Sequence, residues 1–290
     1  MRPELVQKIE RLEEAFRQRR RVLVALSGGV DSTLLQEVAH RALGFEHAIA
    51  VTAKSETLTL QEFKAVCELA RTRGWNHRII EYSELAIPNY AGNPVNRCYF
   101  CKRELFVRLH ELAEKWGCAA VVEGTNADDR GDYRPGMQAA HELGTWAPLL
   151  EHGWTKDEIR EVAQALNLPT WNKPSGACLA SRVPYGSPIT REKLEQIAAA
   201  EQLLKDLGFS QVRVRHHDTI ARIELLPEEM PRLFTDRLAP RIAEEFRRIG
   251  FLYTTLDLLG YRTGSLNATL LANAPAPMPS HSPPIRESRS

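Results

Sequence analysis

The stretch VLVALSGGVDST, residues 22–33, has the residue types of a phosphate-binding turn. Val22 to Leu26 is an apolar run that is too short for a helix and suits a buried parallel strand. Gly28 and Gly29 lack Cβ atoms, so a phosphate can approach the backbone N–H groups there closely. Because residues 33–43 show helical spacing of apolar side chains, the turn also lies at a helix N-terminus, where anions are stabilised.

The polar residues of this turn differ from those of a Walker A loop, which places a lysine before its hydroxyl residue. Here Asp31 precedes two hydroxyl residues, so the pattern indicates another kind of phosphate loop. The alternative is an ordinary strand, turn and helix whose glycines are incidental. If the turn binds phosphate, a β-branched valine at Gly29 is expected to clash. The predicted nucleotide-binding residues are Ser27, Gly28, Gly29, Asp31 and Ser32.

Two of the five cysteines form a CxxC pair, Cys98 and Cys101, just before a predicted helix. Arg97 and Lys102 flank the pair, and nearby positive charge and a helix N-terminus both lower the pKa of a thiol. Cys178 lies in a segment rich in Pro and Gly and is the natural third member. An odd number of cysteines in a reducing compartment favours metal binding or catalysis over a disulfide framework.

Three chemistries suit these cysteines. A structural zinc ion needs four protein ligands, so a histidine would have to join the three thiols. A [4Fe-4S] cluster held by three thiolates keeps one iron open for another ligand. A redox disulfide between Cys98 and Cys101 would leave Cys178 uninvolved. The other two, Cys67 on an apolar helix face and Cys118 at the start of an apolar strand, are expected to be core residues.

Short apolar strands alternate with helices over the first part of the chain. This alternation predicts an α/β fold with a doubly wound parallel sheet, in which ligands sit at the carboxyl ends of the strands. Capping boxes that begin at Thr59 and Thr155 mark two helix starts. The expected strands are 22–26, 48–53, 78–82 and 119–123, and the expected helices are 5–16, 33–43, 59–74, 105–116 and 155–167.

Two irregular segments interrupt this pattern. Residues 124–136 are dense in acids and turn formers at the edge predicted for the ligand. They either reach the nucleotide or a magnesium ion, or form a solvated surface loop. Residues 168–188 contain four prolines and two glycines without periodicity. A long irregular segment in a compact chain is more often functional than idle.

A change of pattern near Thr190 predicts a second, smaller α+β domain. Its expected elements are a helix over 190–207, a hairpin of strands 212–216 and 220–225, a helix over 232–249 and a strand over 252–258. We therefore expect a nucleotide-binding domain over residues 1–186, a substrate-binding or oligomerisation domain over 187–272, and a disordered tail over 273–290.

The composition limits the classes to which this protein can belong. At 290 residues, with 43% hydrophobic and 26% charged residues, the chain has ordinary globular composition and room for two domains. The formal net charge of +1 gives no broad basic surface for nucleic acid. The charged N-terminus has no apolar signal core, and no run is long enough to span a bilayer, so we expect a cytoplasmic protein without a membrane partner.

Four stretches carry a resemblance to known enzymes. SGGVDS from Ser27 is similar to the pyrophosphatase loop of ATP-dependent adenylating enzymes such as GMP synthetase, NAD synthetase and the tRNA-thiolating enzymes. Together with DYRPG from Asp132, TWNKPSGACLASRVPYG from Thr170 and VRVRHHDTIARIE from Val212, it resembles the LarE family of sulfur transferases. The resemblance spans most of the chain before the tail. It implies a sheet like that of the adenine nucleotide α-hydrolases and a role in making the nickel-pincer cofactor of lactate racemase.

The resemblance also implies a reaction. ATP, with Mg²⁺ neutralising phosphate charge, adenylylates a carboxylate of pyridinium-3,5-biscarboxylic acid mononucleotide, and a sulfur nucleophile displaces AMP to leave a thiocarboxylate. Some members sacrifice the sulfur of a single cysteine, whereas others bind a [4Fe-4S] cluster that carries sulfide. Cys98, Cys101 and Cys178 match the three-cysteine form as catalytic and metal-binding residues. The implied partners are a sulfide source, other cofactor-maturation proteins and further copies of the chain.

Two arginines fall on positions where the resemblance implies a substrate phosphate. Arg213 and Arg215 leave the same face of a predicted strand. Their alternative is a solvated strand face. The rival functions are a tRNA-thiolating adenylyltransferase, which the near-neutral charge disfavours, and a nucleotide-binding module without catalysis, in which the three cysteines would have no role.

Overall fold

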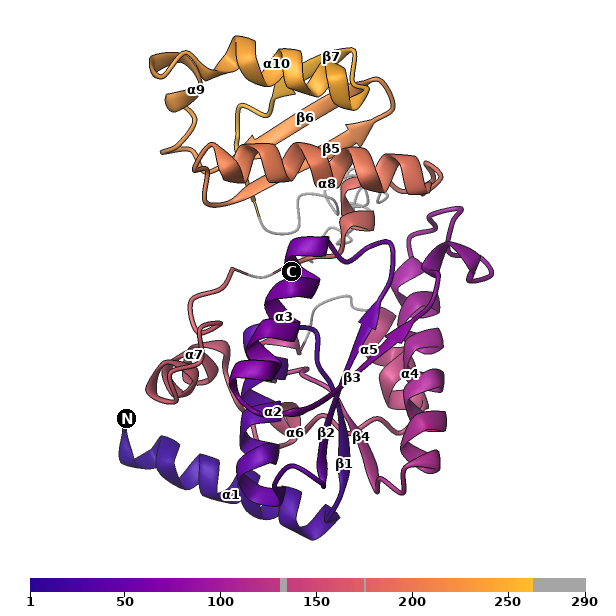
Figure 1. Ribbon diagram of the computed structural model, residues 1–290, viewed down its shortest axis with the longest axis vertical. Coiled ribbons are helices and arrows are strands. Elements are labelled where there is room, and N and C mark those ends of the chain that lie inside the picture. The colour runs from indigo at the N-terminus through magenta and orange to yellow at the C-terminus, as the bar shows by residue number, and fades with distance from the viewer. Residues whose placement is uncertain (131–134, 175, 263–290) are drawn as a thin grey trace, which may run out of the picture.

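The computed structural model describes residues 1–130, 135–174 and 176–262. The larger, N-terminal part of the structure is built around a sheet of four parallel strands in the order β3-β2-β1-β4 (Figure 1). The chain runs outward from β1 to β3 and then returns to place β4 on the other side of β1. This reversal confirms the doubly wound sheet and places the expected ligand crevice at the carboxyl ends of β1 and β4. The strands are β1 Val22–Ala25, β2 Ala48–Lys54, β3 Asn76–Glu81 and β4 Ala120–Val122.

Helices cover both faces of this sheet (Figure 1). Alternate residues of β1 belong to different hydrophobic clusters, because successive side chains of a strand point to opposite faces. Val22 and Val24 pack with α1, α2, α3, α6 and α7, whereas Leu23 packs with α4 and α5. These helices are α1 Pro3–Arg19, α2 Val30–Leu43, α3 Leu60–Thr72, α4 Arg97–Lys115, α5 Pro135–Glu142, α6 Pro148–Glu151 and α7 Lys156–Ala165.

The C-terminal part builds a second sheet of three strands (Figure 1). Strands β5 Val212–His217 and β6 Ile220–Leu225 form the expected antiparallel hairpin, and β7 Tyr253–Leu256 pairs parallel with β6. Helices α8 Arg191–Asp206 and α10 Leu238–Ile249 contribute to the cluster that buries the apolar side chains of this sheet. The domain boundary after residue 186 stays a prediction.

The expected helix over 232–249 is wrong, because the chain forms two helices there, α9 Arg232–Thr235 and α10. Arg237 between them has a left-handed backbone with φ 53°. Pro240, in the first turn of α10, has no N–H to donate to a preceding helical turn, and its ring would clash with that turn. Proline at this position therefore disfavours an unbroken helix by about 3 kcal/mol or more.

The other helices and strands expected from the sequence are present, with ends shifted by a few residues. Both capping boxes form, at Thr59 and at Thr155. The largest shift is at α4, which begins eight residues before its expected start at Leu105. The short helices α5 and α6 were not expected. Within the described ranges, no helix combines the length and the apolar character needed to cross a bilayer.

Candidate functional site

The glycine turn between β1 and α2 is tightest at Gly28. Its φ is +75°, and a Cβ atom built there would lie 3.2 Å from the Cβ of Val66 in α3. Lys173 donates a hydrogen bond from Nζ to the Gly28 carbonyl at 2.9 Å. A Cβ at Gly29 would meet only the Ser27 hydroxyl, at 3.6 Å, so the effect expected of valine there on phosphate binding stays a prediction. Backbone conformation and space both favour glycine at position 28.

The N-terminus of α2 is open to an anion. Gly29 is its N-cap residue, and among the described residues no side-chain hydrogen bond caps this end of the helix. The Ser27 and Ser32 hydroxyls lie 3.1 Å apart beside this turn. Oriented N–H groups, a positive helix end and two hydroxyls together form a cradle for phosphate oxygens, and this supports the phosphate-loop interpretation.

Asp31, in the first turn of α2, faces the crevice between β1 and β4. Lys156 at the start of α7 donates to both of its carboxylate oxygens, each at 2.6 Å. Asn126 donates to Oδ1 of the same carboxylate at 3.1 Å. A Cβ added to Gly124, just after β4, would lie 3.0 Å from the Cβ of Asp31. Asp31 therefore lies next to the carboxyl ends of both β1 and β4.

The segment after β4 was expected either to reach the nucleotide or to be a solvated loop. Asn126 and Asp129 are both buried, and they form a reciprocal cap at the short 3-10 helix η2 Ala127–Asp129. This first part therefore packs beside Asp31 and is not a solvated loop. The DYRPG motif begins at Asp132, and its residues 132–134 lie outside the described residues.

The three candidate cysteines gather on two segments. Because α4 begins at Arg97, Cys98 and Cys101 lie within its first two turns and not before the helix. The sequence did not indicate this start, because Phe100 and Cys101 pack against residues 179–197, far along the chain. Cys178 immediately precedes the 3-10 helix η3 Leu179–Arg182. Each of the three thiols interacts electrostatically with the other two.

The lowered thiol pKa expected for the CxxC pair is wrong for Cys101. Desolvation is the main cause that raises the pKa of Cys101 well above its ordinary value, and the nearby Glu84 carboxylate raises it further. Solvent reaches Cys178, yet protein surrounds its thiol closely enough for desolvation, and then Glu84, to raise its pKa. Arg97 and Arg182 do lower the pKa of Cys178, but their effect is outweighed.

Glu84 is a site residue that the sequence did not reveal. It is buried and accepts hydrogen bonds from the hydroxyls of Ser55, Thr57 and Tyr90 at 2.7–3.0 Å. The backbone carbonyl of Thr57 also accepts a hydrogen bond from Leu179 N–H at 3.2 Å, directly after Cys178. The same loop therefore supports both the acid and the cysteine. No residue pattern in the sequence marks a lone acid of this kind.

The sequence also did not indicate Arg182 and Glu201 as residues of the site. Their buried side chains form a bidentate pair at 2.8 and 2.9 Å, which joins η3 to α8. Arg182 also donates to the backbone carbonyls of Ala177 and Cys178, at 2.5 and 2.9 Å. The backbone at Cys178 is therefore held by a side chain that is itself anchored in the C-terminal part of the chain.

Both candidate phosphate-binding arginines are buried, so their interpretation as a solvated strand face is wrong. Arg215 forms a bidentate pair with the fully buried Glu224 at 2.8 and 2.9 Å and donates to the Ser181 carbonyl. Arg213 lies over the ring of Tyr261, and burial followed by the charge of Arg182 lowers its pKa. Buried cations of this kind are suited to an anionic ligand.

As ligands, the three thiols suit an iron-sulfur cluster. Thiolates are soft donors, and [4Fe-4S] clusters are held by cysteine. Among the described residues, no three His, Cys, Asp or Glu side chains converge closely enough to hold a single metal ion. A structural zinc ion would in addition need a fourth protein ligand beside the three thiols.

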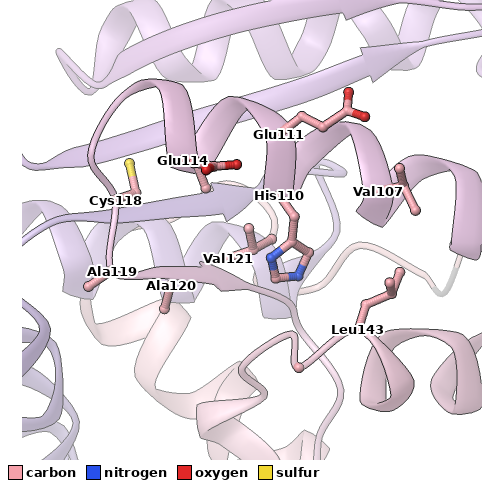
Figure 2. A pocket seen from close by; sticks show the side chains of 11 residues that line it. Val107, His110, Glu111, Glu114, Cys118, Ala119, Ala120, Val121 and Leu143 are labelled. Atoms are coloured by element: carbon pink, nitrogen blue, oxygen red, sulfur yellow. The ribbon is translucent and has the colours of Figure 1, made fainter.

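The remaining two cysteines lie elsewhere. Cys67 and Cys118 are partly buried and pack against hydrophobic clusters, as expected for core residues. Cys118 also lines a hollow of about 560 Å³ between α4 and the start of β4, into which His110 points (Figure 2). This hollow lies by the amino end of β4, away from the glycine turn, and the burial of His110 lowers its pKa.

Comparison with known proteins finds relatives over most of the chain, although no protein-family model matches it. An uncharacterized protein of Synechocystis sp. is 46% identical over 266 residues, which cover 92% of this chain and 99% of that protein. The pyridinium-3,5-bisthiocarboxylic acid mononucleotide synthase of Lactiplantibacillus plantarum is 39% identical over 261 residues, 89% of this chain and 93% of that enzyme. One subunit of the glutamine-hydrolyzing GMP synthase of Methanopyrus kandleri is 26% identical over 218 residues, 68% of this chain and 67% of that subunit.

Proposed function

The chain belongs to the family of pyridinium-3,5-bisthiocarboxylic acid mononucleotide synthases, the LarE family, and on this premise we propose that it converts a carboxylate of pyridinium-3,5-biscarboxylic acid mononucleotide into a thiocarboxylate. The activating substrate is ATP. The observation that carries the proposal is that the phosphate loop and the cysteine loop meet: Lys173, five residues before Cys178, contacts the Gly28 carbonyl.

The reaction has two steps. A carboxylate oxygen of the substrate attacks the α-phosphorus of ATP, the bond from that phosphorus to the bridging oxygen of the β-phosphate breaks, and pyrophosphate leaves. The product of this step is the acyl adenylate. A hydrosulfide sulfur then attacks the acyl carbon, the carbon–oxygen bond to AMP breaks, and the sulfur loses its proton to solvent. A free carboxylate is a poor electrophile, so the first step is required because AMP is a far better leaving group than oxide.

The residues of the turn have distinct roles in the first step. The N–H groups at the open start of α2 and the Ser27 and Ser32 hydroxyls bind phosphate oxygens. Asp31 supplies a hard oxygen ligand of the kind Mg²⁺ prefers. Lys156, which contacts Asp31 in this structure, would exchange that contact for a phosphate oxygen. The similarity to GMP synthase subunits supports this use of ATP and Mg²⁺.

The cysteines serve the second step. We assign Cys98, Cys101 and Cys178 to a [4Fe-4S] cluster, which when bound supplies an open iron for a replaceable sulfide. Arg182 holds the Cys178 backbone, and the buried Glu84 lies close enough to influence the pKa of the thiols. The alternative, in which Cys178 donates its own sulfur and becomes dehydroalanine, needs neither Cys98 nor Cys101.

A direct assay tests the function. The full chain, reconstituted anaerobically with iron and sulfide, is incubated with ATP, Mg²⁺, the biscarboxylate mononucleotide and sulfide. We expect equal amounts of AMP and pyrophosphate and a product in which sulfur replaces one oxygen, detected by mass spectrometry. Release of ADP and phosphate would contradict the adenylylation step, and thiolation of tRNA in place of the mononucleotide would favour the rival enzyme.

The two buried arginines give a further prediction. Arg213→Met is expected to weaken binding of the mononucleotide by about 10- to 100-fold, the effect of losing charged hydrogen bonds, with little change in ATP affinity. Arg215→Met should show the same loss and also lower the free energy of unfolding by about 3 kcal/mol, because it leaves the buried Glu224 short of a partner. Calorimetric titration and urea denaturation measure the two effects.

Arg222→Met is the matched control for this pair. Arg222 also contacts Glu224, but its side chain is 32% exposed, and it comes from the neighbouring strand β6. We expect it to keep the affinity for the mononucleotide. If Arg213→Met and Arg215→Met both bind the mononucleotide as tightly as the unaltered chain, these arginines do not form the phosphate site.

A further inference from the structure

Asn93 lies at the junction of the two segments that carry the candidate thiols. Its side chain is completely buried, and its backbone has a left-handed conformation with φ 57°. The amide nitrogen lies within hydrogen-bond distance of the carbonyls of Val183, Pro184 and Ser187, at 3.2, 2.7 and 3.0 Å. The Asn93 carbonyl accepts from Gly186 N–H at 2.9 Å. Asn93 thus contacts three carbonyls and one N–H group of the loop Val183–Ser187, which follows η3.

The oxygen of the same amide holds the start of α4. Arg97 donates from its guanidinium to Oδ1 of Asn93 and lies over the ring of Tyr185, 4.9 Å from its centroid. The side chain of Arg97 is only 2% exposed, and its Nε has no hydrogen-bond partner among the described residues. The guanidinium is therefore held by a neutral amide and a ring, and its charge remains available to act on Cys178.

These contacts connect the cysteines through short pieces of chain. Arg97 immediately precedes Cys98, and Val183 follows Cys178 with only η3 between them. We propose that Asn93 is a positioning residue that fixes the loop Val183–Ser187, and with it Cys178, against the first turns of α4. The inference rests on the proposed role of the three thiols, but it concerns their placement in the chain before any cluster or substrate is bound.

The chemistry of the position is specific for asparagine. The amide supplies N–H donors to the loop carbonyls and an acceptor to Arg97, and asparagine tolerates the left-handed backbone. Aspartate would keep the acceptor but lose every donor, and it would bring its charge against three carbonyl oxygens. Glycine keeps the backbone conformation at no steric cost and removes only the amide, so it isolates the contribution of the side chain.

The test uses the reduced, iron-free full chain and dibromobimane, a short reagent that links two thiols. Trypsin cuts after Arg97 and Lys102, so the Cys98–Cys101 link stays inside one peptide, whereas a link to Cys178 joins two peptides. Asn93→Gly should reduce the rate of linking to Cys178 about tenfold, the factor that the loss of roughly one net hydrogen bond gives, and leave the Cys98–Cys101 rate unchanged. Asn93→Asp should give the same selective loss.

Asn167→Gly is the matched control, because Asn167 has a similar backbone with φ 53° but an exposed side chain. It should leave both linking rates unchanged. Unaltered linking to Cys178 in Asn93→Gly and Asn93→Asp, with both folded by circular dichroism, would overturn the inference, as would the absence of any link to Cys178 in the unaltered chain. Failure of the proposed reaction would appear in the pyrophosphate and product assays and would leave this result unchanged.

Discussion

Asp31→Ala is expected to reduce ATP-dependent pyrophosphate release by about 10²- to 10³-fold while the protein remains folded. The substitution removes the carboxylate proposed for Mg²⁺ and leaves Lys156 without its partner at the open end of α2. Both side chains of this pair are partly exposed, so its loss should lower the free energy of unfolding by only about 1 kcal/mol or less. Pyrophosphate release and urea denaturation measure the two quantities.

Asp157→Ala is the control for Asp31→Ala. Asp157 is likewise an aspartate in the first turn of a helix, next in sequence to Lys156, but its side chain is exposed and has no hydrogen bond to the glycine turn among those found in the described residues. It should release pyrophosphate at the unaltered rate. Normal turnover by Asp31→Ala would instead show that this turn does not bind the reacting phosphates.

The second large effect concerns the sulfur source. Cys98→Ala, Cys101→Ala and Cys178→Ala should each lower the iron bound after reconstitution to background, remove the broad visible absorption and stop repeated sulfur transfer. Two thiolates cannot replace the three that the assignment requires. Pyrophosphate release should survive in all three variants, because the adenylylation residues lie on the glycine turn and not on the thiols. This separation of the two half-reactions is the diagnostic result.

Cys67→Ala and Cys118→Ala are the controls for these variants. Each removes a partly buried thiol that packs against a hydrophobic cluster away from the other three. Both should keep iron and sulfur transfer. The sacrificial mechanism would be supported instead if the iron-free protein makes one round of product and then carries dehydroalanine at position 178. In that case the Cys98→Ala variant should make this single round of product equally well.

The sequence by itself determined the features that depend on neighbouring residues. The apolar run of β1, the glycine pair and the helical spacing after Thr33 predicted the strand, turn and helix of the phosphate loop. The capping box at Thr59 fixed the start of α3, because cap and helix lie within one turn of each other. Alternation of such units was sufficient to predict a doubly wound parallel sheet, since few topologies accommodate it.

The tertiary structure alone decided which charges meet. Lys156 reaches Asp31 across 125 positions of sequence, and only the reversal of strand order between β1 and β4 brings them together. The sign of the pKa shift of Cys101 was predicted wrongly from the basic residues around the CxxC pair. Local charge was visible in the sequence, but desolvation and Glu84 were not, and these dominate at Cys101. Burial and long-range charge pairs depend on which surfaces pack together, and no local pattern of residues encodes that.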